Sequence, residues 1–216
     1  MCYIDIKMSI EDKIKSLVET DNGYLRVKLA ESHGIARAYV YEFLKRNPSY
    51  QKIAAGIYYN AVRIRPDMLY VLACRNPGIV YSHMTAVHIH KLATTPEFYD
   101  ITVKQGYSTL HFGNLVDRTV IHQISSPKVL TLGKERIFDP LGNVVPVYNM
   151  ERTICDLLRT KNCYSQKAFS QTMMRYFQSC SEDNMDLLLQ YADQLKVQEE
   201  LNLCLALFGK MHLINK

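Results

Sequence analysis

The chain has 216 residues, of which 48% are hydrophobic and 22% are charged. This composition is typical of a folded protein with a buried core, and it excludes a largely disordered chain. The formal net charge is +5, and most of the excess lies near the N-terminus, since residues 1–65 hold 11 Lys and Arg against 7 Asp and Glu. A local basic excess favours a polyanionic partner such as nucleic acid.

The six cysteines are scattered over positions 2, 74, 155, 163, 180 and 204, with no CxxC pair. This pattern predicts free thiols in a reducing cytoplasm and argues against a zinc site. We find no signal-peptide pattern and no apolar run long enough to cross a bilayer. The expected location is therefore the cytoplasm, with no membrane partner.

Two short helices are predicted before residue 33. Ser9 is suited to cap a helix over 10–20, with Asp12 three residues later, and Asn22-Gly23 ends that helix. A second helix is expected over 25–32, with Arg26 and Lys28 exposed. In a helix-turn-helix module, a helix at this position supports the next helix across the sugar-phosphate backbone of DNA.

A third helix is predicted over 36–47 by apolar residues at helical spacing, which are Ala36, Val40, Phe43 and Leu44. Arg37, Tyr41 and Lys45 are each four residues apart and fall in one row on the opposite side. Arg and Lys suit guanine edges and phosphates. An ordinary surface helix with a solvated charged row is the alternative interpretation.

The run from Tyr50 to Tyr59 then predicts a hairpin turning at Ala55-Gly56. Across residues 23–59 the order is helix, glycine turn at Gly34, helix and two-stranded ribbon, which predicts a winged helix-turn-helix over residues 1–62. The expected DNA contacts are Arg26, Lys28, Arg37, Tyr39, Tyr41, Lys45 and Lys52.

Residues 67–216 predict a larger α+β domain with a mostly antiparallel sheet and C-terminal helices. A helix begins at Asp67, and a second follows Ser82 as far as Leu92. Strands are expected in 97–107, in 118–125 and within 128–150, with a turn at 140–143. A helix begins at Glu151, and three more cover 166–178, 182–195 and 197–210.

Two polar groups in this domain could carry chemistry. His83, His88 and His90 have spacings of five and two, whereas a helical zinc site needs histidines four apart, so structural histidines are expected. Glu151, Arg152, Thr153 and Asp156 match the charged start of an ordinary helix. No phosphate loop, nucleophile elbow or carboxylate pair is present, so we expect no enzyme, no cofactor and no metal.

The three stretches 77–93, 97–107 and 144–159 together resemble the AbiEi family of bacterial antitoxins from type IV (abortive infection) toxin–antitoxin systems. The matching residues are Ser82-His83, Thr85-Ala86, His90, Leu92, Thr102-Val103, Gly106-Tyr107, Val147-Tyr148, Glu151-Arg152-Thr153 and Asp156. The family also carries an N-terminal winged helix, so the resemblance covers nearly the whole chain.

The resemblance implies an autorepressor that binds inverted repeats in its own promoter, two copies at a time. It also implies that the second domain counteracts a nucleotidyltransferase-like toxin without a stable complex. The implied antitoxin-domain motif is Ser82, His83, Thr85, Glu151, Arg152, Thr153 and Asp156. Two alternatives stay open: a stand-alone winged-helix regulator with a ligand-sensing or oligomerising second domain, and a DNA-targeted enzyme.

Overall fold

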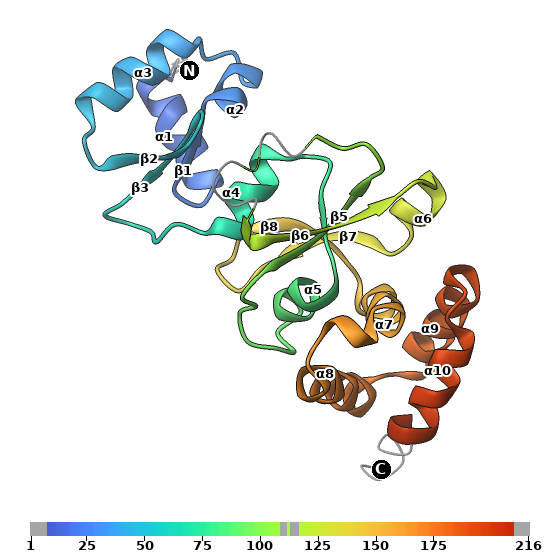
Figure 1. Cartoon of the computed structure of the whole chain (residues 1–216). Coiled ribbons are helices and arrows are strands. Elements are labelled where there is room, and N and C mark those ends of the chain that lie inside the picture. Colours follow the sequence, from blue (N-terminus) through green and yellow to red (C-terminus); the bar gives the residue numbers. More distant parts are fainter. Residues whose placement is uncertain (1–7, 109–111, 113–116, 210–216) are drawn as a thin grey trace, which may run out of the picture. The chain divides into compact units, whose positions relative to one another are not determined.

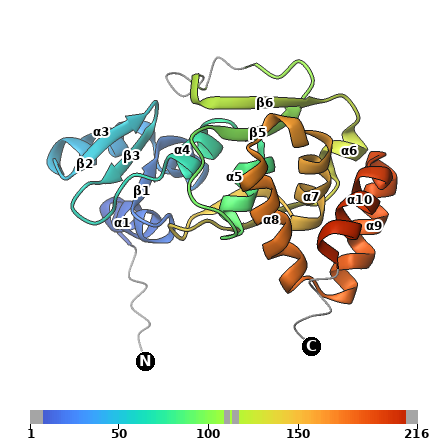
Figure 2. The same cartoon turned by 60° about the horizontal axis from the view of Figure 1, so that its bottom comes forward.

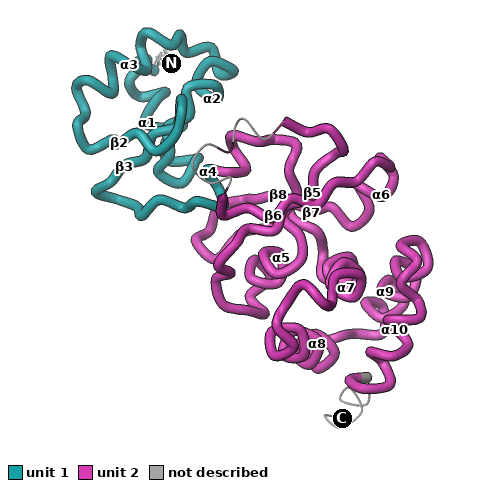
Figure 3. Tube along the Cα trace, viewed as in Figure 1, with its two compact units in different colours: residues 1–71 teal, residues 72–216 magenta. Residues whose placement is uncertain are grey.

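The computed structural model describes residues 8–108, 112 and 117–209. The chain forms two compact units, residues 1–71 and 72–216, which Figure 3 colours separately. Helices and strands alternate in both, so the α+β expectation is confirmed. The division between the units falls inside helix α4 (Met68–Arg75).

The described part of unit 1, from residue 8 onward, contains three helices before α4 and a small sheet (Figure 1). The helices are α1 (Ile10–Thr20), α2 (Val27–Ser32) and α3 (Arg37–Arg46). The strands are β1 (Tyr24–Arg26), β2 (Tyr50–Ala54) and β3 (Ile57–Asn60), antiparallel in the order β1-β3-β2. Ser9 caps α1 as predicted, because its hydroxyl accepts from the backbone N–H of Asp12 at 3.1 Å.

The second predicted helix begins two residues later than expected, and the ribbon has a third strand. Residues 24–26 form β1, in which Leu25 lies opposite Tyr58. This partner lies more than thirty positions along the chain, so local helical spacing could not reveal the pairing. The prediction of a helix from residue 25 and of a two-stranded ribbon was therefore wrong at this point.

The core of unit 1 is formed by one face of each helix. Ile14, Val18, Ala30, Val40 and Phe43 are all buried there. The prediction of the buried side of α3 holds for Val40 and Phe43, whereas Ala36 precedes the helix and is exposed. Gly34 has φ +76°, and a Cβ there would meet nothing within 4 Å, so backbone conformation alone favours glycine in this turn.

Unit 2 has a five-stranded sheet with helices packed against it (Figures 1 and 2). The strands are β4 (Val80–Tyr81), β5 (Tyr99–Lys104), β6 (Thr119–Ile124), β7 (Lys134–Phe138) and β8 (Val144–Tyr148). The helices are α5 (His83–Ile89), α6 (Pro127–Thr131), α7 (Met150–Arg159), α8 (Gln166–Ser179), α9 (Glu182–Leu195) and α10 (Gln198–Cys204).

The expectation of a mostly antiparallel sheet holds for two of the four strand pairings in unit 2, and the sheet is mixed. Its order is β6-β5-β4-β8-β7. Strands β4/β5 and β7/β8 pair antiparallel, whereas β5/β6 and β4/β8 pair parallel. Alternation of residue types identifies strands but not their direction, and the two-residue strand β4 between β5 and β8 is too short to give a periodic signal.

The C-terminal helices pack with α7 around one hydrophobic core. Leu157 of α7, Met173 and Phe177 of α8 and Leu188 of α9 are fully buried together. Helices α8 and α9 match the predicted ranges, and Ser181 caps α9 with Asn184 in a reciprocal capping box. The last helix ends earlier than predicted, since α10 passes into a π-helical turn at Leu205–Gly209. Within the described ranges no helix has the length and apolarity needed to cross a membrane.

Candidate functional site

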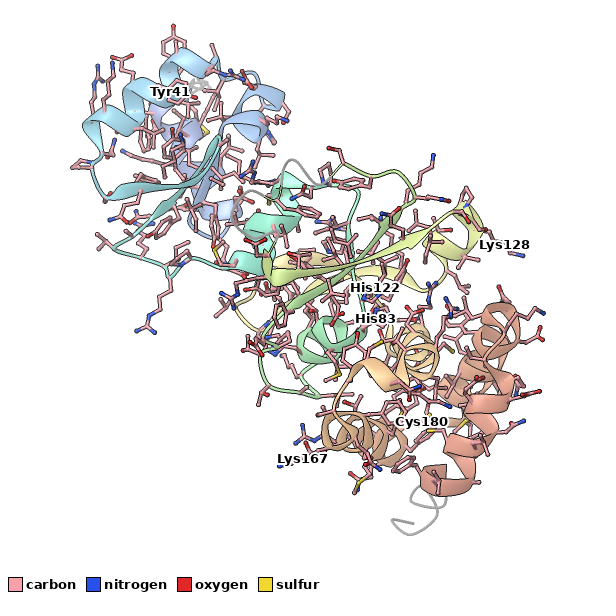
Figure 4. All side chains as sticks on the ribbon, viewed as in Figure 1. Tyr41, His83, His122, Lys128, Lys167 and Cys180 are labelled. Atoms are coloured by element: carbon pink, nitrogen blue, oxygen red, sulfur yellow. The ribbon has the colours of Figure 1, made fainter. Side chains whose placement is uncertain are left out.

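Helix α3 presents the predicted row of polar side chains to solvent. Arg37, Tyr41 and Lys45 are exposed, and we call these three residues the α3 row. Figure 4 labels Tyr41 on this helix. Tyr39 and Tyr41 are 47% and 41% exposed, unusually open for large aromatic side chains. The row is therefore accessible to a macromolecular partner.

Lys28 on α2 and Lys52 on β2 are also exposed, as predicted. They lie on different elements of unit 1 from the α3 row, so unit 1 offers cations from its helices and from its hairpin. An extended polyanion contacts several elements of a small domain at once. This distribution of charge would allow Lys28 and Lys52 to contact the charged backbone of such a polyanion.

Arg26 does not belong with these exposed cations. Its Nε and Nη2 donate to the two carboxylate oxygens of Asp21 at 2.6 and 2.8 Å. Its guanidinium also lies 5.6 Å from the ring centre of Tyr70. The expectation that Arg26 is fully exposed is wrong, because the residue ends β1 and turns back to Asp21, the buried cap of α1. Its predicted contact with DNA stays a prediction.

In unit 2 the predicted motif residues separate into two groups. Ser82, His83 and Thr85 lie at the start of α5, and all three are buried. The Ser82 hydroxyl does not cap the helix. It lies 2.9 Å from Nδ1 of His83 and accepts a hydrogen bond from Thr102 at 2.9 Å. Thr85 instead accepts from the backbone N–H of Asp100 at 2.8 Å.

His83 meets two residues that the sequence analysis missed, Asp100 and His122. The rings of His83 and His122 stack with centroids 3.7 Å apart, and Figure 4 labels both residues. Nε2 of His122 lies 3.0 Å from Oδ1 of Asp100, and the same oxygen accepts from the Tyr164 hydroxyl at 2.9 Å. We call His83, Asp100 and His122 the histidine–aspartate cluster.

Strand register brings this cluster together. In the parallel pair β5/β6, Thr102 lies opposite His122, so Asp100, Thr102 and His122 share one face of the sheet. The backbone N–H of Ser82 donates to the carbonyl of Asp100, which fixes the start of α5 against that face. The available sequence signal was a pair of polar residues, Asp100 and Thr102, two positions apart in an otherwise apolar strand. Only the strand register places them beside His122.

The backbone and protonation of His83 are unusual. Its φ is +47°, a left-handed conformation that non-glycine residues seldom adopt and that clusters at functional sites. Burial, followed by the charges of His122, Arg152 and Arg159, holds the pKa of His83 well below its usual value. The ring is therefore neutral at pH 7 and can accept at one nitrogen.

A cavity of about 480 Å³ opens beside this cluster within unit 2. Asp100 and Tyr164 line it together with Glu97, Phe98 and Arg175. The volume is in the range of small-molecule sites. Asp100, although buried, therefore borders this cavity.

The second motif group lies on α7 and is structural in its contacts. Arg152 is fully buried, and its Nε donates to Asp156 at 3.0 Å, as the expected pairing along the helix requires. Its Nη1 donates to the carbonyls of Val129 and Leu132 at 2.6 and 3.1 Å, and its guanidinium lies over the ring of Tyr148. Arg152 thus joins α6 to α7.

The remaining motif residues and histidines also bind nearby groups. Glu151 accepts from Tyr176 and Asn184, which link α7 to α8 and α9. Thr153 donates to the backbone carbonyl of Tyr148 at 3.3 Å. His88 and His90 each lie within 3.2 Å of a backbone carbonyl, as structural histidines do.

Comparison with models of known protein families finds none that matches this chain, and comparison with curated protein sequences finds no match either. The resemblance to AbiEi antitoxins therefore rests on the matching residues themselves.

Proposed function

We propose that this protein is a DNA-binding autorepressor of the type IV antitoxin kind. In this proposal unit 1 is a winged helix-turn-helix that lays α3 in the major groove, and unit 2 counteracts a nucleotidyltransferase-like toxin. The observation that carries the DNA-binding half is the solvent-exposed α3 row of Arg37, Tyr41 and Lys45. The order α2, Gly34 turn, α3, β2, β3 supports it, because a winged helix has this order.

The dimensions of α3 suit a groove. A helix with its side chains is about 10–12 Å across and the major groove is about 12 Å wide, so α3 could enter the groove with its ten residues extending about 15 Å. Arg37 is the first residue of the helix, and recognition helices contact base edges mainly with their N-terminal residues. Arg37 would therefore donate to a guanine edge, while Tyr41 and Tyr39 contact neighbouring bases or phosphates.

Phosphate contacts would hold the protein in register. Lys45 lies in the last turn of α3, and Lys28 and Lys52 lie on α2 and β2. Neutralising phosphates releases counterions, so affinity would fall steeply with salt. Two copies on an inverted repeat would then cover the promoter and exclude polymerase.

The antitoxin half of the proposal is supported by the family resemblance. The resembling residues all lie in unit 2, and the seven motif residues among them lie at the start of α5 and along α7. The α7 group has structural contacts, whereas the α5 group meets the cavity-lining Asp100. The resemblance further implies action without a stable complex, so a tight heterodimer with the toxin is not proposed.

A binding assay tests the DNA-binding half. Fluorescence anisotropy would compare wild type, Arg37→Ala and Lys167→Ala on the DNA upstream of the protein's own gene. Lys167 is an exposed cation on α8 of unit 2 and serves as the matched control (Figure 4). Loss of one bidentate guanine contact should weaken the DNA affinity of the Arg37→Ala variant by roughly 5-fold to 100-fold. Equal affinity of all three proteins would contradict the proposal.

A rescue assay tests the antitoxin half. A nucleotidyltransferase encoded next to this gene would be expressed alone and together with the full chain, and growth would be recorded. We expect growth arrest alone and recovery with the full chain, with Arg37→Ala rescuing as well as wild type when both genes have a foreign promoter. Failure to rescue would contradict the antitoxin half.

The cavity beside Asp100 favours one second candidate, a DNA-binding regulator whose unit 2 senses a small molecule. The two assays separate it from the first. Intact operator binding with no rescue would select this second candidate, whereas rescue selects the antitoxin.

A further inference from the structure

The histidine–aspartate cluster gathers three metal-binding side chains from three different elements. His83 begins α5, Asp100 lies in β5 and His122 lies in β6. One ring nitrogen from each histidine and one carboxylate oxygen lie within 4.8 Å of one another. Within the described part of the chain this is the one group of His, Cys, Asp and Glu with such an arrangement.

The donor set has a defined chemistry. Two imidazoles and one carboxylate are the protein ligands of catalytic zinc sites and of non-haem iron sites. Bonds of about 2.0–2.1 Å in a tetrahedral ion place ligand atoms about 3.4 Å apart. Nε2 of His122 and Oδ1 of Asp100 are already 3.0 Å apart, and the three donor atoms lie within 4.8 Å of one another, so the side chains must draw closer together to bind one ion.

Hydrogen bonds from neighbouring side chains restrain two of the three donor residues. Ser82 lies at Nδ1 of His83, which leaves Nε2 of that ring for another partner. The Tyr164 hydroxyl donates to Asp100, and Thr102 donates to Ser82. Hydrogen bonds of this kind to the ligands fix ring orientation in metal sites and are part of their affinity.

The buried cluster also has an opening. Asp100 lines the cavity of about 480 Å³, and His122 has 22% of its side chain exposed. An ion can therefore reach the donors from solvent, and water can complete its coordination. The sequence-based expectation of no metal considered the cysteine pattern and the spacing of histidines along one helix, whereas these donors come from a helix and two paired strands.

We propose that His83, Asp100 and His122 bind one divalent transition-metal ion of the zinc type, with water as a further ligand. This site is independent of DNA binding by unit 1, and its test uses a different readout.

Metal uptake by tag-free, full-length protein tests the site. The protein would be treated with a chelator, dialysed, and titrated with Zn²⁺ by calorimetry and with Co²⁺ by visible absorption. We expect one ion per chain and Co²⁺ bands typical of nitrogen and oxygen ligands. No saturable uptake, or a sulfur-to-cobalt charge-transfer band that assigns the ion to cysteine such as Cys163 at the cavity, would overturn the proposal.

Single substitutions locate the ion. His122→Ala should weaken Zn²⁺ binding by more than about 100-fold, since loss even of an outer-shell partner costs 10- to 100-fold. His33→Ala, which removes an exposed histidine of unit 1, should bind as wild type does. His122 is partly exposed, and circular dichroism would verify that its variant folds.

A conservative variant covers the case of misfolding. If His122→Ala is unfolded, Asp100→Asn keeps the shape of the side chain and should still lose Zn²⁺ affinity by at least about tenfold. Equal Zn²⁺ affinity in Asp100→Asn, His33→Ala and wild type would overturn the proposal.

Discussion

Arg37, the first residue of α3, donates two hydrogen bonds to Glu31 of α2, at 3.0 and 3.2 Å. The side chains are 58% and 38% exposed, so water and salt weaken this pair. A guanine edge or a phosphate could replace Glu31 at small cost. The pair holds Arg37 in place, and Glu31 adds a negative charge beside the α3 row.

Glu31→Gln should tighten DNA binding. The change releases Arg37 and removes one charge that repels phosphate, so we expect a roughly 2- to 10-fold lower Kd at low salt. Glu199→Gln on α10 removes an exposed charge from unit 2 and is the control. Anisotropy titrations measure both, and a weaker Glu31→Gln complex would show that Arg37 needs Glu31 in order to bind.

Lys45→Ala should change the salt dependence of binding more than its sequence preference. Each lost phosphate contact lowers the slope of log K against log salt by about 0.9. Lys128→Ala, on α6 of unit 2, should leave the slope unchanged (Figure 4). Titrations at four salt concentrations give the slope, and an unchanged slope for Lys45→Ala would remove Lys45 from the phosphate contacts.

Local sequence signals predicted most of unit 1. Ser9 and Asn22-Gly23 marked the ends of α1, and the apolar spacing of Val40 and Phe43 marked α3. The pairing of Arg26 with Asp21 could not be predicted, because it depends on the direction in which the chain passes from the end of α1 into β1. Whether a charged residue at the end of an apolar strand is exposed or paired depends on three-dimensional geometry, which the spacing of residues along the chain does not specify.

The candidate cluster of unit 2 depended on information of longer range. The sequence marked His83 and Thr85 through a family resemblance, and it placed both strands that carry the other donors. It could not predict that β5 and β6 run parallel with Thr102 opposite His122. Register between strands is set by packing over the whole sheet, so the meeting of Asp100 with His122 appears only in three dimensions.

Gly133→Ala should destabilise unit 2 strongly. A Cβ there would lie 2.6 Å from Oδ1 of Asn149 and 2.7 Å from Cβ of Arg152, and φ is +70°. Overpacking together with backbone strain should lower the free energy of unfolding by about 2–4 kcal/mol. Gly106→Ala shares a positive φ of +79° but meets nothing within 4 Å, so it should cost about 1 kcal/mol. Thermal unfolding followed by circular dichroism compares them, and equal losses would refute the crowding at Gly133.

Arg152→Ala should be more damaging than any exposed arginine substitution. It leaves Asp156 buried without its partner and the carbonyls of Val129 and Leu132 without a donor. Breaking a buried pair in this way costs about 3–5 kcal/mol. Arg136→Ala, an exposed control on β7, should change stability little. Urea unfolding measures the difference, and similar midpoints for both variants would contradict the structural role of Arg152.

The described cysteines should differ sharply in reactivity. Burial raises the pKa of Cys155 to about 12 and that of Cys204 to about 11, whereas Cys163 is exposed. Only the thiolate reacts, and at pH 8 a thiol of pKa about 12 is ionised in roughly one molecule in ten thousand. Maleimide labelling with peptide mapping at pH 8 should find Cys163 modified long before Cys155. Equal labelling would mean that the core around α7 opens readily.

Selection from a random DNA library by the full-length protein tests the central claim, that the α3 row reads DNA sequence, most directly. Wild type should enrich an inverted repeat that also occurs upstream of its own gene, and Arg37→Ala should lose the preference for one base pair in each half-site while Lys167→Ala keeps it. Enrichment of no sequence by wild type, or the same repeat with unchanged base preference for Arg37→Ala, would contradict it.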